Sequence, residues 1–283
     1  MEVALGYDEN FIGGDPVRLP TLSTRLQEAA FNGGTPVDHE RFSLIFSKER
    51  GLAIVTAHTI DGATLIPAGQ IARNDRFRLD DQVDREHQID NDRGYVNNPW
   101  DRGHLVRRRS LHWGNEQEAR EADRQSYFWT NIAPQHEDLH DTAWGPIEDW
   151  MLDRAESGNQ RAAVFTGPVM TPDDPVHQNR PGEDPIQIPA GFWKIIVIPF
   201  GGARTVAAFL VWQRDHDSED PVTFDPLLEQ VRLTTIEFLT GLSFADLRGL
   251  DPLRFGTSTR GMAADAAPIR RMGTILTPGD IVL

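Results

Sequence analysis

Apolar and polar residues alternate along residues 42–46 and again along 53–57, and a polar turn at 48–51 separates the two runs. Alternation with a period of two is typical of β-strands that bury one face, so this stretch predicts a β-hairpin. Further runs rich in apolar and β-branched residues predict additional strands at 162–166, 192–200 and 205–212.

A helical spacing of apolar residues begins near Asp141. From there, apolar side chains recur at three- and four-residue steps through Trp150 and Met151, and Pro146 falls in the first turns, where proline is tolerated. This helix is expected to end near Ala155. Shorter helices are predicted at 22–31, 115–125 and 234–240, and strand-like patterns occur in the aromatic run 126–130 and at 280–283.

Strands and helices thus alternate without an internal repeat, which predicts an α+β fold with one mixed α/β sheet core. We divide the chain into an ordered lead-in at 1–37, a core-bearing domain at 38–247 and a tail at 248–283 that could act as an interaction segment. The polar stretch 73–100 is too long for a simple connection, which predicts either a functional or a mobile segment.

Composition narrows the class of protein. The chain has 283 residues, of which 39% are hydrophobic and 25% charged, and it contains no apolar run of the roughly 18 residues needed to span a bilayer. We therefore expect no membrane partner. Residues 1–10 include acidic side chains and lack the basic patch and apolar run of a secretory signal, so a cytoplasmic location is the default expectation. Signal-independent delivery stays open.

The absence of cysteine and the excess of acidic residues exclude several kinds of site. Without cysteine the chain forms no disulfide, and any metal ion must be held by His, Asp, Glu or Asn. A net charge of −15 argues against a protein that coats nucleic acid, although it is compatible with a local basic groove. The only lysines are Lys48 and Lys194; the other cations are arginines, whose planar fork suits phosphate, but genome composition could produce the same bias.

One dense cluster of candidate catalytic residues is Asp101-Arg102-Gly103-His104, followed by three arginines at 107–109. Like-charge repulsion from arginines favours the neutral form of a nearby histidine, and a neutral imidazole can accept a proton from water. This motif therefore suggests a general base. A solvated surface turn is the alternative interpretation of the same residues.

A second cluster spans residues 130–141 and contains His136 and His140, which are four residues apart. On a helix this spacing would put both imidazoles on one face, as in some zinc sites. Pro134 and the acidic run that follows it favour a loop instead, in which both histidines would simply be solvated. The sequence leaves both interpretations open.

Together the two clusters resemble the DNA/RNA non-specific endonuclease family, the endonuclease G-like branch of the ββα-metal nucleases. The resemblance rests on the Asp-Arg-Gly-His motif, on the segment 130–135, and on Ala143-Trp144 with Glu148. It covers roughly residues 5–247 and implies a ββα-metal finger motif within the mixed fold. Supporting matches are Phe42-Ser43, Asp61-Gly62, Arg73 with Phe77, Phe165-Thr166-Gly167-Pro168, Ile188-Pro189, Phe192-Trp193-Lys194, Ile236-Glu237 and Leu239-Thr240-Gly241-Leu242.

The resemblance implies one divalent metal ion, Mg²⁺ or Mn²⁺, with His104 as general base. The family's metal ligand is an asparagine, and the matching position here is His140, which is a departure from the pattern. An asparagine oxygen suits Mg²⁺, whereas imidazole favours softer ions such as Mn²⁺, Ni²⁺ or Zn²⁺. His140 would bind metal with an altered preference, leave the ion to a neighbour such as Asn131 or Asp141, or mark a weakened enzyme.

By the same analogy, Arg73 and Arg102 would brace the scissile phosphate, and Glu148 would accept hydrogen bonds from the ion's water shell or orient its ligand. Further residues are expected in the second shell or in substrate binding, namely Asp101, Asn131, Arg107, Arg108 and Arg109. The implied substrates are DNA and RNA, cleaved to leave 5′-phosphate ends.

Other functions and partners remain open at this point. A nuclease-like fold kept as a binding or regulatory module is one alternative, and a zinc hydrolase built on His136 and His140 is another. The resemblance also suggests a homodimer. Because an unrestrained nuclease endangers its own cell, an inhibitor or an activating partner is a further expectation.

Overall fold

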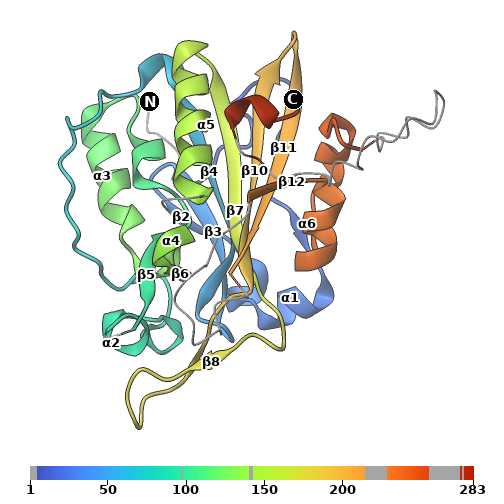
Figure 1. Ribbon diagram of the computed structural model, residues 1–283. Helices are drawn as coiled ribbons and strands as arrows, with labels where there is room; N and C mark the ends of the chain where they lie inside the picture. Colours follow the sequence, from blue (N-terminus) through green and yellow to red (C-terminus); the bar gives the residue numbers. More distant parts are fainter. Residues whose placement is uncertain (1–4, 97, 140–142, 214–227, 255–274, 276) are drawn as a thin grey trace, which may run out of the picture.

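The fold comes from a computed structural model that describes residues 5–96, 98–139, 143–213, 228–254, 275 and 277–283. The described chain forms one large sheet with helices on both sides (Figure 1). No helix within these ranges has both the length and the apolar character that a bilayer crossing requires.

The central sheet has seven antiparallel strands in the order β12-β11-β10-β7-β4-β3-β2. The hairpin and the three later strands predicted from the sequence are all present in it. Its strands are β2 (Val37–His39), β3 (Phe42–Ser47), β4 (Leu52–Asp61), β7 (Arg161–Val169), β10 (Gly191–Phe200), β11 (Ala203–Trp212) and β12 (Leu228–Val231).

Three two-stranded pairs lie outside the central sheet. The ribbon that carries the Asp-Arg-Gly-His motif is antiparallel and pairs β5 (Trp100–His104) with β6 (Ile132–His136). The other two pairs are β1 (Thr21–Leu22) with β13 (Leu242–Ser243), and β8 (Val176–His177) with β9 (Ile186–Gln187).

Helices cover both faces of the sheet, so all ten residues of β4 are buried. The helices α3 (Glu116–Ser126) and α5 (Gly145–Ser157) lie on one side, and α1 (Thr24–Ala29) and α6 (Leu233–Thr240) lie on the other (Figure 1). Each side has its own apolar core cluster. The short helices are α2 (Asn91–Gly94) and α4 (Glu137–Leu139), with 3₁₀ turns at Phe31–Gly34, Gly62–Thr64, Arg85–His87, Arg108–Leu111, Trp129–Asn131, Ala245–Leu250 and Pro278–Asp280.

Two predicted strands are wrong. The aromatic run 126–130 does not form a strand, because α3 continues through Ser126 and a 3₁₀ turn follows at Trp129–Asn131. Tyr127 and Trp129 are nevertheless buried, and a strand-like composition reports burial as much as backbone shape. Residues 280–283 form no strand either, since a 3₁₀ turn ends at Asp280.

The C-terminal residues return to the edge strand β12. The Ile275 N–H donates to the Leu228 carbonyl at 2.8 Å, and the Gln230 side chain makes two hydrogen bonds of 2.8 Å with the backbone of Val282. Ile275, Ile281 and Leu283 pack against the same core cluster as α5. This segment therefore belongs to the folded body.

The two strands of the ribbon are separated along the chain by the helix α3 and by 3₁₀ turns on either side of it. After β6 the chain forms α4 and then α5, whose buried face packs against the sheet through Ile147 and Met151. The fold is thus a mixed arrangement of helices and one main sheet, as predicted, with the motif-bearing ribbon beside it.

Candidate active site

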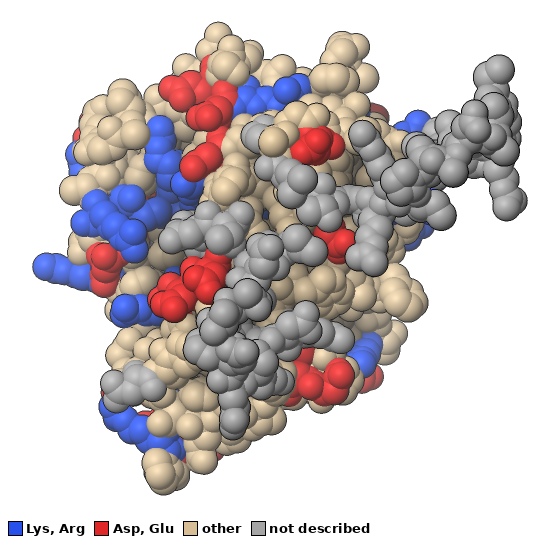
Figure 2. All heavy atoms as spheres, in the orientation of Figure 1, with Lys and Arg blue, Asp and Glu red and all other residues tan. Residues whose placement is uncertain are grey.

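A cleft of about 640 Å³ opens beside the β5–β6 ribbon. Figure 2 shows basic side chains gathered on the side of the visible face where α3 and β5 lie in Figure 1, with acidic ones next to them. The cleft contains nearly all of the predicted site residues. Its lining is Arg73, Asp75, Phe77, Asp101, Arg102, Gly103, His104, Arg107, Arg108, Arg109, Gln135, His136, Glu137 and Glu148.

The strand β5 explains the spacing of the Asp-Arg-Gly-His motif. Side chains two residues apart on a strand share a face, so Arg102 and His104 both project from the same side of the ribbon. Gly103 lies between them, and a Cβ at this position would be 2.2 Å from the Gln135 side chain. Glycine is therefore required here so that Gln135 can pack across the ribbon.

His104 is half-buried, but its Nε2 atom is buried and makes no hydrogen bond to any described residue. Burial is the main cause that lowers its pKa to about 4, and the charges of Arg73 and Arg108 add to the shift. Asp123 and Asp75 act in the opposite direction. The neutral form expected from the sequence is thus favoured, mainly by burial and only secondarily by the arginines.

Two cleft arginines are held by carboxylates. Arg73 donates from Nε to Oδ1 of Asp75 at 2.6 Å. Arg108 donates from Nε to Oδ1 of Asp123 at 2.8 Å, and the same oxygen lies 2.6 Å from Nε2 of His112. These carboxylates fix each guanidinium against one wall of the cleft.

Arg107 and Arg109 complete the arginine run. Arg107 lies 2.7 Å from Asp149 and 3.5 Å from Glu148, whereas Arg109 donates to the carbonyl oxygen of His112 at 3.5 Å. The three arginines do not lie on a strand, because Arg107 precedes a 3₁₀ turn that covers Arg108–Leu111. All three arginines consequently line the cleft.

Glu148 enters the site from the first turn of α5 and pairs with a buried lysine. Its Oε1 accepts a hydrogen bond of 3.1 Å from Nζ of Lys194, which also donates to Oγ1 of Thr166 at 3.0 Å. Nζ lies 4.9 Å from the ring centroid of Trp144. Burial lowers the pKa of Lys194, and the charge of Glu148 opposes this shift. Glu148 therefore links the core of the protein to the cleft.

Asn131 is close to the site but has a structural role. Its fully buried amide donates to the carbonyl oxygens of Val106 and Ser126 and accepts the Val106 N–H at 2.9 Å. These bonds hold the chain between β5 and η4 (Arg108–Leu111), so the amide is committed to the backbone rather than free for an ion. Asp101, by contrast, is exposed at the cleft wall.

His136 lines the cleft at the end of β6. Its Nδ1 accepts the N–H of Asp138 at 3.2 Å. Within the described ranges, no group of three or more His, Asp or Glu side chains is arranged to hold a metal. The predicted ligand His140, like Asp141, lies outside the described residues.

The structure adds residues to which sequence reasoning gave no role in the site. They include Phe77, Asp75 and Glu137 in the cleft, Asp123 behind Arg108, and Lys194 beneath Glu148. A signal existed for Lys194, because a lysine within the apolar run 192–200 must find a partner when it is buried. Nothing comparable in the sequence indicated that Asp123 contacts the site, because it is one of many charged residues in the predicted helix 115–125.

The class of protein follows from this fold and cleft together with a family match. The model of the DNA/RNA non-specific endonuclease family matches residues 23–248. The chain therefore belongs to this family, which confirms the resemblance inferred from the sequence.

Individual relatives are more distant. The chain is 30% identical over 273 residues to an uncharacterized protein, y4fB, of Sinorhizobium fredii, covering 85% of this chain and 39% of the relative. It is 27% identical over 134 residues to human mitochondrial endonuclease G, covering 45% of this chain and 43% of the relative. The chain thus spans about two fifths of the length of these curated relatives.

A solved structure supports the fold independently. The crystal structure of an EndoG/EndoGI complex contains a chain that is similar to this one with a TM-score of 0.56 and 16% identity. The similarity covers 78% of this chain and 91% of that chain. At this identity the comparison supports the fold alone.

Proposed function

We propose that this protein is a metal-dependent endonuclease that hydrolyses phosphodiester bonds in DNA and RNA and leaves 5′-phosphate ends, with His104 as general base. The observation that carries the proposal is an imidazole whose buried Nε2 atom makes no hydrogen bond within the described residues, in a cleft lined by five arginines. Burial lowers the pKa of this imidazole, which favours its neutral form. Membership of the endonuclease family supports the same reaction.

Phosphodiester hydrolysis needs an in-line water, a base that takes its proton, and positive charge on the phosphoryl oxygens. His104 supplies the base, because a ring that is neutral at pH 7 can accept a proton from the attacking water. Arg73 and Arg102, which both line the cleft, supply positive charge, and each guanidinium can offer two N–H groups to one phosphate. Each effect is worth several kcal/mol, roughly.

A hydrated divalent ion fits the donor chemistry near the end of β6. Mg²⁺ keeps most of its waters and needs few protein ligands, so a set of three protein ligands is not required. We assign the direct ligand to His140, and Glu137 and Glu148 line the cleft as oxygen acceptors for hydrating water. When bound, Mg²⁺ or Mn²⁺ would supply positive charge to the phosphate and the leaving oxygen.

The arginine cleft also accounts for cleavage without sequence preference. Contacts to phosphate and sugar position a nucleic acid but carry no sequence information. Among the described lining residues, the cationic groups are guanidiniums suited to phosphate. We therefore assign both DNA and RNA as substrates.

The test is cleavage of plasmid DNA and of a long RNA by purified protein with Mg²⁺ or Mn²⁺. We expect cleavage that a chelator stops and that returns when the metal is restored. His104→Ala should lose at least about 100-fold in rate, the low end of what a general base contributes, while its melting temperature stays near that of the wild type. Substantial cleavage by a well-folded His104→Ala protein would contradict the assignment of the base.

The same assay decides the alternative of a binding or regulatory module. That alternative is favoured by the histidine at position 140 and by the net charge of −15. It predicts that the protein binds nucleic acid but does not cleave it with any ion in a screen of Mg²⁺, Mn²⁺, Ni²⁺ and Zn²⁺.

The proposal also includes control of the nuclease activity and dimerisation of the protein. The similar solved chain comes from a crystal structure of the EndoG/EndoGI complex, in which EndoG is inhibited. We propose that this protein is likewise controlled by an inhibitor or an activating partner, and that it forms a homodimer. Light scattering of the purified chain tests the second point.

A further inference from the structure

Arg102 differs from most of its neighbours in the way it is held. Arg73, Arg107 and Arg108 each pair with a carboxylate. Among the described residues, no acidic side chain forms an ion pair with Arg102. Its guanidinium carbon lies over the ring of Phe77, 5.0 Å from the ring centroid, and its Nη1 makes a long hydrogen bond of 3.4 Å to the side chain of Asn91.

Other aromatic rings hold Phe77 in place. It stacks on Trp129 with centroids 5.1 Å apart and an interplanar angle of 21°. Trp129 in turn stacks on Tyr95 at 5.5 Å and 13°. The ring of Tyr127 meets Phe77 edge-on at 5.1 Å and 78°. The ring of His104 also lies beside Phe77, at 5.7 Å and 53°. The ring beneath Arg102 is therefore the end of a stack of three, with the rings of Tyr127 and His104 beside it.

The backbone beside Phe77 is fixed as well. The Arg78 N–H donates to the Tyr127 carbonyl at 3.1 Å, and the Trp129 N–H donates to the Arg78 carbonyl at 2.9 Å. This pairing joins the segment that contains Phe77 to the turn just before β6. Phe77 consequently moves with the ribbon that carries Arg102.

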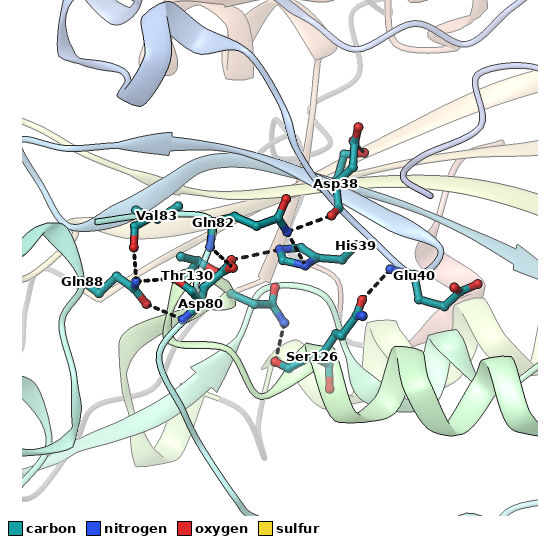
Figure 3. Close-up of polar contacts among 12 residues, drawn as sticks. Asp38, His39, Glu40, Asp80, Gln82, Val83, Gln88, Ser126 and Thr130 are labelled. Atoms are coloured by element: carbon teal, nitrogen blue, oxygen red, sulfur yellow. Dashed lines mark hydrogen bonds and ion pairs between the residues drawn. The ribbon is translucent and has the colours of Figure 1, made fainter. Parts of the chain in front are cut away.

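A buried polar cluster around Asp80, three residues after Phe77, anchors the same segment (Figure 3). Asp80 accepts a hydrogen bond of 2.8 Å from Oγ1 of Thr130, and its Oδ2 lies 3.1 Å from Nε2 of His39 on β2. Gln88 closes the loop by bonding the backbone N–H and carbonyl of Asp80. The end of this loop is thus attached to the sheet through His39 and to the turn before β6 through Thr130.

We propose that Phe77 is a positioning residue that holds the Arg102 guanidinium ready for a substrate phosphate. An aromatic face attracts the cation without a formal negative charge, so it orients the side chain and leaves its charge available to the phosphate. A carboxylate in the same place would compete with the phosphate for the N–H groups. Preordering also removes part of the entropy loss on binding. The inference rests on the proposed function, because it assigns Arg102 a phosphate.

The contact itself can be tested on the protein without nucleic acid. Protons above an aromatic ring resonate upfield, so the Nε–H signal of Arg102 in a ¹⁵N-labelled sample should be shifted upfield. Arg102→Lys identifies the signal by removing it. We expect the shift to disappear in Phe77→Leu and to remain in Phe77→Tyr. An unshifted signal in the wild type overturns the proposal without any variant of Phe77.

The positioning role is tested by a double-mutant cycle on binding of a fluorescent oligonucleotide in the presence of a chelator. Phe77→Leu should raise Kd about three- to tenfold, the range for loss of a cation–π contact. In an Arg102→Ala background the same change should have less than about a twofold effect, because Phe77 acts through Arg102. Phe77→Tyr should bind within about twofold of wild type. Additive effects of the two changes would overturn the proposal.

A matched control exists elsewhere on the surface. Arg161 lies over the ring of Phe11 at 4.9 Å, outside the cleft, so Phe11→Leu removes an equivalent contact and should leave Kd unchanged. If Phe77→Leu does not fold, Phe77→Met keeps the apolar volume and lacks the ring. If wild-type protein binds nucleic acid but does not cleave it with any metal ion, the proposed function is wrong. The double-mutant cycle on binding still tests the role of Phe77 in that case.

Discussion

His104 lies where burial and two guanidinium groups all oppose protonation of its imidazole. An imidazole in such a place is neutral at pH 7 and can accept a proton, but the imidazolium that results is stable only if nearby negative charge stabilises it. Asp75 and Asp123 act in the favourable direction, since their charges raise the pKa of His104. We infer that these two carboxylates stabilise the imidazolium that forms when the water is deprotonated.

The pH dependence of cleavage follows from the lowered pKa. A histidine acts as a base only when neutral, so activity should persist well below pH 6.5 and fall as the pH drops through about 4. The measurement is kcat/KM against pH at saturating metal, with folding checked at each pH. A loss centred near the ordinary histidine pKa of about 6.5 would show that His104 is not shielded.

At the scale of secondary-structure elements, one buried ion pair joins β10, an interior strand of the main sheet, to α5. Lys194 is fully buried on β10, Glu148 is 2% exposed on α5, and their charged atoms are 3.1 Å apart. Glu148 also approaches Arg107, so the pair connects the sheet to the cleft wall. The position of α5 relative to the ribbon therefore depends on a charge in the core.

Removal of one partner should be strongly destabilising. Lys194→Met leaves the Glu148 carboxylate buried without its main cation, and such a change costs about 3–5 kcal/mol of the free energy of unfolding. The double variant Lys194→Met/Glu148→Gln should recover most of that loss, because no buried charge remains unpaired. Urea unfolding measures both values.

An exposed pair on α3 serves as the control for this experiment. Glu116 and Arg120 form an ion pair on the exposed helix surface, so Glu116→Gln should leave the free energy of unfolding nearly unchanged. A Lys194→Met protein as stable as this control would mean that the buried pair contributes nothing.

Sequence patterns predict the elements of this fold better than their mutual contacts. The apolar runs located β7, β10 and β11 because a buried strand needs many consecutive apolar residues. The run 126–130 misled the prediction because its aromatic side chains are buried from a 3₁₀ turn. Composition can report that a segment is buried without reporting its backbone conformation.

For the candidate site, too, the sequence predicts individual residues better than the contacts between them. The Asp-Arg-Gly-His motif marked Arg102 and His104 as candidates from the sequence, but their shared face of a strand became visible only in the structure. The approach of Arg73 to His104 could not be predicted either, because it depends on how the loop before Asp80 is attached to β2 and to the ribbon. Lys194 was visible as a charge in an apolar run, but its partner on α5 was not.

At the scale of the whole molecule, the protein combines a net charge of −15 with a cleft that concentrates arginines. Under the proposed function, the acidic remainder would repel nucleic acid at long range, and binding would depend on short-range contacts of the cleft with phosphates. This arrangement would restrict nucleic acid to the cleft and disfavour coating of the surface.

Binding should therefore be weak and strongly salt-dependent. If three arginines contact phosphates, affinity for a duplex or single strand is expected to fall about 20- to 40-fold between roughly 50 and 200 mM salt. Fluorescence anisotropy with a chelator measures the slope. Arg120→Gln, which changes a cation on α3 away from the cleft lining, should leave the slope unaltered. A flat dependence would contradict phosphate recognition by the cleft.

The return of residues 275–283 to β12 affects how copies of the protein behave in concentrated solution. An edge strand offers unsatisfied backbone groups to any similar strand that approaches it. Here Ile275 already takes the Leu228 carbonyl, and the Gln230 side chain ties down Val282 beside the strand. A proteolytic cut that released this segment would uncover the margin of the sheet and favour fibrous self-association while leaving the catalytic cleft intact.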